Sequence, residues 1–304
     1  MPGTREIRRR IKSVKNTGKI TRAMEMISSV KMRKAVEGVY AMRPYAFHAL
    51  EVLRALRAAP EIVSTLPLLS ERPRKTVLFV VVTSSRGLCG SFNAQIFRRI
   101  KSEVVSMTLL SPDVRFEYLS LGKKGDTGLR FLPGDIMASF PEVALSPTSK
   151  SVRSVASLLF SGFEDSRWSD VFLVYTDFVS ALLQKPRVRR ILPFSRVDTE
   201  EELGEMGEPL PIETGSSARS EYVIEPSAER VLSTLLFRLT EMQILHALFE
   251  SKASEEAARM VAMRNATDAS KEMTESFTLL YNQLRQAKVT QEIAELSAGM
   301  AAVA

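Results

Sequence analysis

The chain has 304 residues, 45% of them hydrophobic and 25% charged, which is the composition of an ordinary folded protein with a core. Its single cysteine, Cys89, excludes an intramolecular disulfide and a cysteine-rich zinc site. Two histidines, His48 and His246, are too few for a multi-histidine metal centre, and we expect no cofactor. The longest apolar run is Val77–Val82, so we expect no direct membrane insertion.

The net charge of +7 is unevenly distributed. Residues 1–60 hold 14 basic residues against 4 acidic ones, whereas residues 195–229 hold 10 acidic residues against 2 basic ones. Such asymmetry indicates separate surfaces for separate partners. A basic arm is able to bind nucleic acid or anionic lipid, and a solvated helix face accounts for the same charges about equally well.

The first predicted helix runs from Thr4 to about Ala59, where Pro60 ends it. Pro44 is the one strong helix breaker inside, which predicts a kink or short break near Arg43. Apolar residues recur at intervals of three and four, except for one gap of six, which predicts a seam that changes phase. The stripe consists of Ile7, Ile11, Val14, Ile20, Met24 and Ile27.

The second predicted helix begins after Pro226, with Ser227 as its N-cap, and meets no further glycine or proline until Gly299. A helix of this length extends roughly 110 Å. Its expected heptad seam consists of Met273, Phe277, Leu280, Leu284 and Ala287, followed after a slip by Ile293, Leu296 and Met300. An isolated helix with one apolar stripe needs a partner, and the first helix offers a matching stripe with opposite charge. The two helices therefore predict a long antiparallel coiled coil.

The segment between the helices alternates strand and helix patterns, which predicts an α/β domain with a mostly parallel sheet and one late hairpin. The expected strands are Thr76–Thr83, Val114–Leu121, Val171–Thr176 and Arg187–Phe194, and the expected helices are Phe92–Met107 and Thr148–Phe163. Residues 195–225 are expected to form an acidic surface loop. The predicted organisation is thus a coiled-coil helix over 1–59, a three-layer α/β domain over 74–225 and a second coiled-coil helix over 227–304.

The glycine-containing stretch from Arg86 to Asn93 follows the first strand, where backbone N–H groups can cradle a phosphate. The Gly-Lys-Ser/Thr ending and the Gly-x-Gly-x-x-Gly spacing are both absent, so tight-turn glycines are the favoured interpretation. A nucleotide-binding α/β enzyme that uses this loop is the first alternative function. A basic coiled-coil protein that binds nucleic acid or a membrane surface is the second, although the basic run Arg5–Lys34 has no aromatic residue to stack on bases.

The last nine residues, Leu296 to Ala304, are small or apolar and carry no charged side chain. Chain ends are usually polar and frayed. An apolar end on a long helix predicts that another protein encloses it.

Several segments resemble the gamma subunit of F-type rotary ATP synthases, of the bacterial type. The N-terminal helix, the glycine turn and the C-terminal helix all carry the likeness, over nearly the whole chain. The segments are Arg5–Thr17, Lys19–Met26, Arg86–Gly90 with Asn93, Ala257–Met263, Asn265–Asp268, Tyr281–Asn282, Arg285–Ala287 and Thr290–Ile293 with Glu295. Met300 departs from the alanine usual there, and the acidic segment 195–220 is longer than in many relatives.

The resemblance implies a non-catalytic rotor shaft whose partners are the alpha and beta subunits of the hexameric head, the epsilon subunit and the c-ring of the membrane sector. It implies no nucleic-acid partner. Contacts with the catalytic beta subunits are implied for Arg285, Gln286, Thr290, Met24 and Arg259.

The same resemblance implies contacts with the c-ring and epsilon for Tyr222 and Glu225. The likeness begins near residue 5, inside the basic stretch, so we expect no transit peptide ahead of it. The implied location is the cytoplasmic face of a bacterial plasma membrane, as a peripheral membrane protein.

Overall fold

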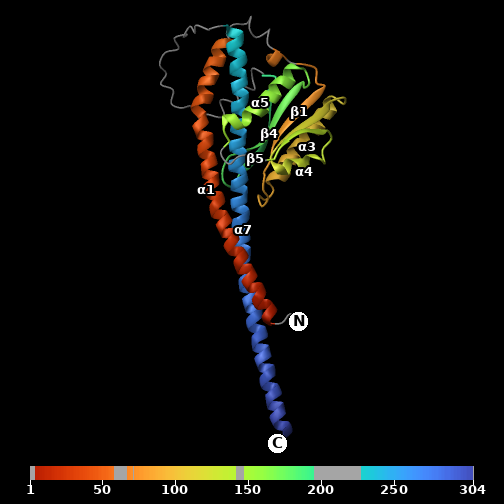
Figure 1. The fold of residues 1–304 in the computed structure, drawn as a ribbon. Coiled ribbons are helices and arrows are strands. Elements are labelled where there is room, and N and C mark those ends of the chain that lie inside the picture. The colour runs from red at the N-terminus through yellow and green to blue at the C-terminus, as the bar shows by residue number, and fades with distance from the viewer. Residues whose placement is uncertain (1–3, 58–66, 71, 142–146, 195–226, 304) are drawn as a thin grey trace. The chain divides into compact units, whose positions relative to one another are not determined.

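A computed structural model describes residues 4–57, 67–70, 72–141, 147–194 and 227–303. The chain divides into two compact units, one made of residues 1–29 and 259–304 and the other of residues 30–258. Two long helices, α1 (Thr4–Arg57) and α7 (Ala228–Val303), contribute to both units (Figure 1).

Five strands form the sheet of the larger unit, in the order β3-β2-β1-β4-β5. They are β1 (Thr76–Val82), β2 (Arg115–Leu121), β3 (Asp135–Phe140), β4 (Asp170–Phe178) and β5 (Gln184–Leu192). β1 pairs in parallel with β2 and β4, β2 pairs in parallel with β3, and only β5 is antiparallel, to β4. The prediction of a mostly parallel sheet with one late hairpin is confirmed.

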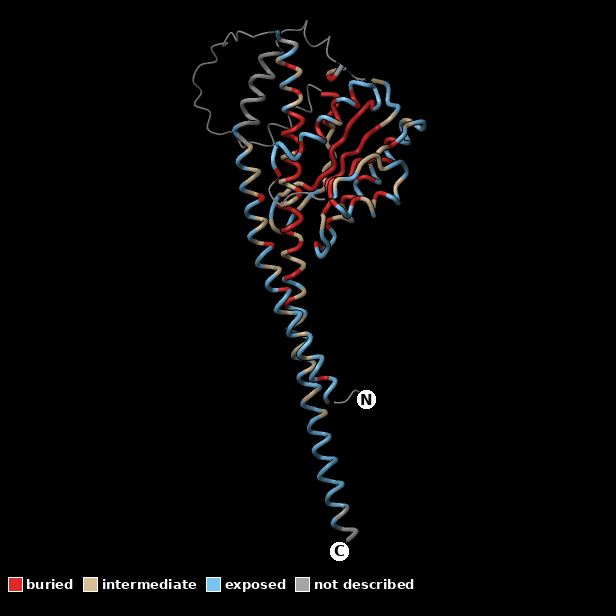
Figure 2. Tube along the Cα trace, in the orientation of Figure 1, coloured by how far each residue is buried: buried red, intermediate tan, exposed pale blue. Residues whose placement is uncertain are grey.

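Helices cover both faces of this sheet, so the predicted three-layer α/β architecture is confirmed (Figure 1). The helices α3 (Phe92–Leu110) and α4 (Lys123–Leu129) pack on one face, against alternate residues of β1 such as Phe79. The helix α5 (Ser149–Glu164), the short 3-10 helix η1 (Pro67–Leu69) and the first part of α7 pack on the other face. Phe160 of α5 and Phe237 of α7 meet edge to face, with ring centroids 5.1 Å apart. Buried residues concentrate in the sheet and at these contacts (Figure 2).

Two elements of the α/β domain were not predicted, the helix α4 and the strand β3. The sequence of α4 contains Gly125 and Gly128, which argue against a helix on propensity alone. Packing requires both glycines, because an added Cβ at Gly125 would collide with Ser120 and one at Gly128 would collide with the ring of Phe97. β3 is a short edge strand without a continuous apolar run, so its pattern is weak.

The proline positions also differ from expectation. α1 continues through Pro44, so a break near Arg43 is wrong; a proline removes one backbone hydrogen bond, and long helical segments on both sides tolerate that loss. Pro186 lies inside β5 rather than in the preceding connection, which an edge strand permits. The N-cap of α7 is confirmed, because the Oγ of Ser227 accepts a hydrogen bond from the N–H of Arg230 at 3.3 Å.

The predicted acidic loop 195–225 lies outside the described residues. None of the helices that the structure describes has a stretch long and apolar enough to cross a membrane.

Candidate partner-binding surface on the paired helices

In the smaller unit α1 and α7 lie side by side and run in opposite directions (Figure 1). The Oγ1 atoms of Thr21 and Thr267 are 2.7 Å apart, and the Cβ position at Gly18 lies 3.2 Å from the Cβ of Ser270. As α1 advances from residue 18 to residue 21, its neighbour on α7 falls from 270 to 267. The prediction of an antiparallel helix pair is therefore confirmed.

Burial identifies the seam of this pair. On each helix the buried or half-buried positions recur at alternating intervals of four and three, which is the heptad spacing. The seam consists of Ile7, Ile11, Val14, Gly18, Thr21, Glu25 and Ser28 on α1 and of Met263, Thr267, Ser270, Thr274, Phe277, Tyr281 and Leu284 on α7.

The phase change predicted after Val14 is wrong. Gly18 and Thr21 continue the stripe without a slip, whereas Ile20 is 61% exposed and Ile27 is 54% exposed. The apolar pattern was misleading because small and hydroxyl-bearing residues occupy the middle of the seam. One of the two hydroxyl groups donates to the other, and the one that accepts donates in turn to a carbonyl of its own helix, that of Gly18 for Thr21 or that of Met263 for Thr267. Both hydroxyl groups are therefore hydrogen-bonded although they are buried.

The seam predicted on α7 is partly wrong. Phe277 and Leu284 are half-buried as expected, but Met273 is 52% exposed and Ala287 is exposed. Leu280 is exposed as well. The true seam contains Thr274 and Tyr281 in their place, and Leu284 is its last half-buried position among the described residues.

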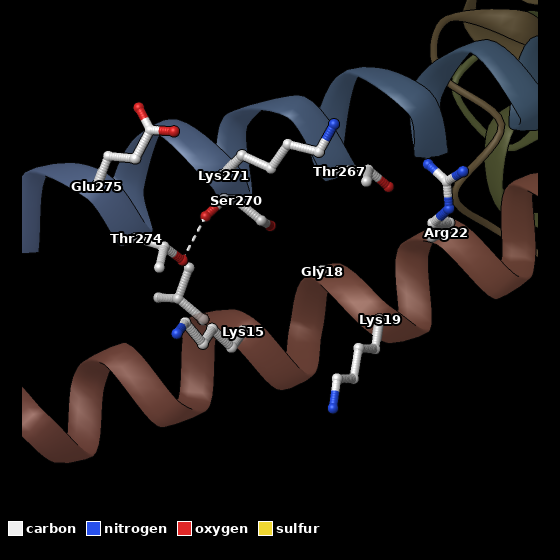
Figure 3. A pocket seen from close by; sticks show the side chains of 10 residues that line it. Lys15, Gly18, Lys19, Arg22, Thr267, Ser270, Lys271, Thr274 and Glu275 are labelled. Atoms are coloured by element: carbon white, nitrogen blue, oxygen red, sulfur yellow. Dashed lines mark hydrogen bonds between the residues drawn. The ribbon is translucent and has the colours of Figure 1, made fainter. Parts of the chain in front are cut away.

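A shallow groove of about 320 Å³ follows the hydroxyl-lined part of the seam (Figure 3). Its lining combines Gly18, Thr267, Ser270 and Thr274 with the basic residues Lys15, Lys19, Arg22 and Lys271 and the acidic Glu275. The hydroxyl of Thr274 donates to the carbonyl of Ser270 at 2.7 Å. The surface beside the seam is therefore strongly basic.

Beyond Leu284, α7 has no buried or half-buried position among the residues whose burial is described. Residues 285–298 and 300 are all exposed, including the apolar Ile293, Leu296 and Met300 at 58%, 70% and 71% (Figure 2). Arg285, Gln286 and Thr290 lie on this part, exposed as their predicted contact with another subunit requires. At about 1.5 Å per residue, the segment from 285 to 303 is roughly 28 Å of helix with no described partner in the chain.

The remaining predicted contact residues have different surroundings. Met24 is half-buried beside the seam, whereas Arg259 is buried, with only 6% of its surface exposed. Sequence reasoning did not foresee the burial of Arg259, since an arginine on a long helix is ordinarily a surface residue. Tyr222 and Glu225 lie outside the described residues.

The loop that follows β1, one of the alternatives for a nucleotide site, is held by hydrogen bonds between its own residues. Asn93 accepts a hydrogen bond from the N–H of Ser84 at 3.1 Å and donates to the hydroxyl of Ser84 at 2.8 Å. Leu88 and Gly90 have positive φ angles of 64° and 57°, so the loop contains the tight turns that its glycines predicted. Cys89 is buried in the same turn.

A family model described as ATP synthase matches residues 3–303. The ATP synthase gamma chain of Roseiflexus castenholzii is 40% identical over 305 residues, a match that covers 100% of this chain and 99% of that one. The ATP synthase gamma chain of Heliobacterium modesticaldum is 39% identical over 317 residues, with both chains covered completely. The chain belongs to the bacterial ATP synthase gamma chain family. Membership makes it a non-catalytic subunit of the central stalk.

Solved structures share the fold. The chain resembles one from the mitochondrial ATP synthase of Euglena gracilis, an assembly of OSCP, F1 and c-ring, with a TM-score of 0.65 and 19% identity over 99% of this chain and 94% of that one. It also resembles one from the central stalk and c-ring of the Tetrahymena thermophila enzyme, with a TM-score of 0.59 and 24% identity over 81% of this chain and 99% of that one. The fold class predicted from the sequence is therefore confirmed.

Proposed function

We propose that the chain is the rotating shaft that couples ion-driven rotation of a membrane c-ring to conformational cycling of catalytic beta subunits. The exposed end of α7 carries this proposal. Its apolar side chains at Ile293, Leu296 and Met300 have no partner among the described residues, and burying such groups stabilises an assembly by about 25 cal/mol per Å². A sleeve formed by the alpha and beta subunits would enclose them.

The contact with the beta subunits is assigned to Arg285, Gln286 and Thr290. Gln286 and Thr290 share a face of α7 because they are four residues apart, and the guanidinium of Arg285 can form a charge-assisted hydrogen bond with a carboxylate. Such a bond breaks and re-forms as the shaft turns. It therefore acts on turnover and assembly more than on the stability of the chain.

Met24 and Arg259 complete the proposed contact with the head. Met24 is half-buried, so part of its side chain is available to a beta subunit. Because little of Arg259 is exposed, its effect runs through the placement of the α7 surface around it. A Met24→Lys substitution is expected to weaken coupling between rotation and catalysis, with compensating changes on α7 near Arg259 or Gln286.

At the other end of the shaft, Tyr222 and Glu225 are proposed to meet the c-ring and the epsilon subunit, on the strength of their resemblance to the family segment before the long helix. Tyr222→Ala combined with Glu225→Lys should uncouple ion flow from synthesis and leave ATP hydrolysis by the soluble head intact. Normal proton or sodium pumping by this double variant in membrane vesicles would contradict the assignment. The assembled complex is proposed to lie on the cytoplasmic face of the plasma membrane.

The decisive experiment is reconstitution of the tagged chain with the alpha, beta and epsilon subunits. Co-purification of the alpha, beta and epsilon subunits with the chain tests the proposed partners. ATP hydrolysis by the reconstituted complex tests the proposed role as a rotating shaft. Substituting Arg285, Gln286 and Thr290 with alanine together should lower hydrolysis or head assembly severalfold, whereas the isolated chain keeps the circular dichroism of the wild type.

A matched control is alanine at Glu272, Ser276 and Leu279, three exposed positions on the paired part of the same helix. The control should assemble and turn over normally. Unchanged turnover in an assembled head that carries the Arg285, Gln286 and Thr290 triple variant would show that these residues are solvated and do not contact the beta subunits.

A further inference from the structure

The end of β4 is fastened to α7 within the larger unit. The backbone N–H of Thr176 donates to the Oγ of Ser251 at 3.0 Å, and the Oγ of Ser254 donates to the carbonyl of Thr176 at 3.2 Å. Both serines are buried. Two hydrogen bonds that bracket one residue fix the register of the helix on the strand.

Two carboxyl groups lie beside this junction, Asp177 on β4 and Glu250 on α7. Asp177 is paired with Arg187, whose Nε lies 2.7 Å from its Oδ2. The Oε1 of Glu250 lies 3.4 Å from the Nε2 of His246. The Oε2 of Glu250 is buried and accepts no hydrogen bond from any donor in the described part of the chain. Glu250 precedes Ser251 and Asp177 follows Thr176, and the N–H of Thr176 bonds to Ser251, so the two carboxyl-bearing residues adjoin the same junction. Two carboxyl groups form a hydrogen bond only if one of them carries a proton.

The surroundings decide which form of Glu250 is stable. Burial of the side chain is the main cause that raises the pKa of Glu250 from its ordinary 4.5 to about 8, and the neighbouring Asp177 raises it further. Arg189 and Arg187 on β5 act in the opposite direction and lower this pKa. Tyr175 of β4 and His246 of α7 are the other titratable groups beside it. The described ion pairs give Asp177 an arginine, Arg187, whereas the largely buried Glu250 has only His246, so the raised pKa of Glu250 favours its protonated form at neutral pH.

We propose that Glu250 and Asp177 bind one proton between them, and that this shared proton holds α7 against the end of β4. When the proton leaves, two adjacent carboxylates repel each other across the junction that Ser251 and Ser254 otherwise fasten. The junction is tight in neutral solution and loosens in alkaline solution. This property goes beyond the shaft function and belongs to the isolated chain, so it holds or fails independently of every partner.

The sign of the pH dependence follows from proton binding. Between the ordinary pKa of 4.5 and the raised value of about 8, the folded chain holds a proton that the unfolded chain has released, so stability falls as the pH rises. Below this window both states hold the proton, and above it neither does. The contribution of the proton is therefore complete at low pH and is lost by the time the pH passes about 8.

Urea unfolding of the full-length chain tests the proposal. Glu250→Gln keeps the size of the side chain and its ability to donate a hydrogen bond to Asp177, but it cannot titrate. Between about pH 5 and 7 the unfolding equilibrium constant of the wild type should rise about tenfold per pH unit relative to that of the variant, the slope for one proton. Glu272→Gln, an exposed position on the same helix, should follow the wild type. Parallel curves for the wild type and Glu250→Gln would overturn the proposal.

A second measurement does not depend on the folding of that variant. Infrared spectra of the wild type should show the carbonyl stretch of a buried protonated carboxyl group at about pH 6–7 and lose it at about pH 9. Asp177→Asn should move the loss of the band to lower pH, because Asp177 helps to raise the pKa of Glu250 and the asparagine amide can donate to an ionised Glu250. His246→Gln should retain the band. A wild type without the band at neutral pH, or a pH slope that disappears in His246→Gln but persists in Glu250→Gln, refutes the shared proton.

Amide hydrogen exchange then locates the effect. After correction for the intrinsic rate, residues 175–178 and 250–254 should exchange faster at about pH 9 than at about pH 6 in the wild type and equally in Glu250→Gln. A uniform acceleration across the larger unit would place the change elsewhere.

Discussion

One helix, α7, packs in two different ways along its length. From Leu232 to Leu248 it presents leucine, methionine and isoleucine to the sheet and to α5, and nearly all of these are fully buried. From Thr267 to Thr274 it presents hydroxyl groups to Gly18 and Thr21 of α1. The first arrangement anchors a domain through apolar area. The second keeps two helices together with small side chains and a few hydrogen bonds, so this middle stretch of the seam buries little apolar surface.

The contrast suggests a division of physical roles. An apolar core resists local opening because each large side chain touches many neighbours. A seam of glycine, serine and threonine gains less from burial and more from hydrogen bonds that specify register. Register is what a shaft needs, since a slip of one helix past the other would displace every surface residue that a partner contacts.

The largest effect is expected in the apolar part. Leu236→Ala removes a fully buried side chain from the contact of α7 with the sheet layer, which should lower the free energy of unfolding of the larger unit by about 2–5 kcal/mol. Urea unfolding monitored by tryptophan fluorescence reports on this unit, because Trp168 lies in the same buried cluster. Leu279→Ala, at a position of the same helix that is 65% exposed, should change the value by less than about 0.5 kcal/mol. Equal losses of stability for the two substitutions would contradict the distinction between the buried apolar part of α7 and its exposed part.

The hydroxyl seam should respond to single and double substitutions in opposite ways. Thr267→Val removes the hydrogen bond between the helices but leaves Thr21 able to donate to the carbonyl of Gly18, so it should destabilise the paired helices by about 0.5–1.5 kcal/mol. Adding Thr21→Val removes the remaining buried hydroxyl and leaves two apolar side chains of nearly the same shape, so most of the loss should be recovered. The measurement is a double-mutant cycle on the unfolding of the full chain, followed by helical circular dichroism. Additive losses would mean that the two hydroxyl groups do not act as a pair.

The sequence predicted the architecture well where apolar patterns carry it. β1 is a continuous apolar run, and the lengths of α1 and α7 follow from the scarcity of glycine and proline, so the sheet, the three layers and the antiparallel pair were all foreseen. α4 was missed because Gly125 and Gly128 lower helix propensity, while their close contacts with Ser120 and Phe97 require glycine. Propensity and packing conflict there, and packing decides.

The candidate surface was predicted less completely, for a related reason. A search for apolar residues at intervals of three and four selects Ile20 and Ile27, which are exposed, and passes over Gly18 and Thr21, which form the seam. The usable signal was the unbroken spacing of small and hydroxyl-bearing residues in register with Ile7, Ile11 and Val14. Arg285, Gln286 and Thr290 are exposed because they follow Leu284, the last half-buried position described, whereas the predicted seam continued to Met300.

The smallest effect is expected at the residues that the apolar pattern selects. Ile20→Gln combined with Ile27→Gln replaces two exposed isoleucines with a good helix former, so the free energy of unfolding of the isolated chain should change by less than about 0.5 kcal/mol per site. If these isoleucines formed the seam, the same pair of substitutions would bury two polar amides and cost several kcal/mol. The two registers therefore differ by far more than the error of a urea titration. A large loss of stability would mean that the seam does change phase after Val14. The hydroxyl pairing of Thr21 with Thr267 would then not be the contact that holds the helices together.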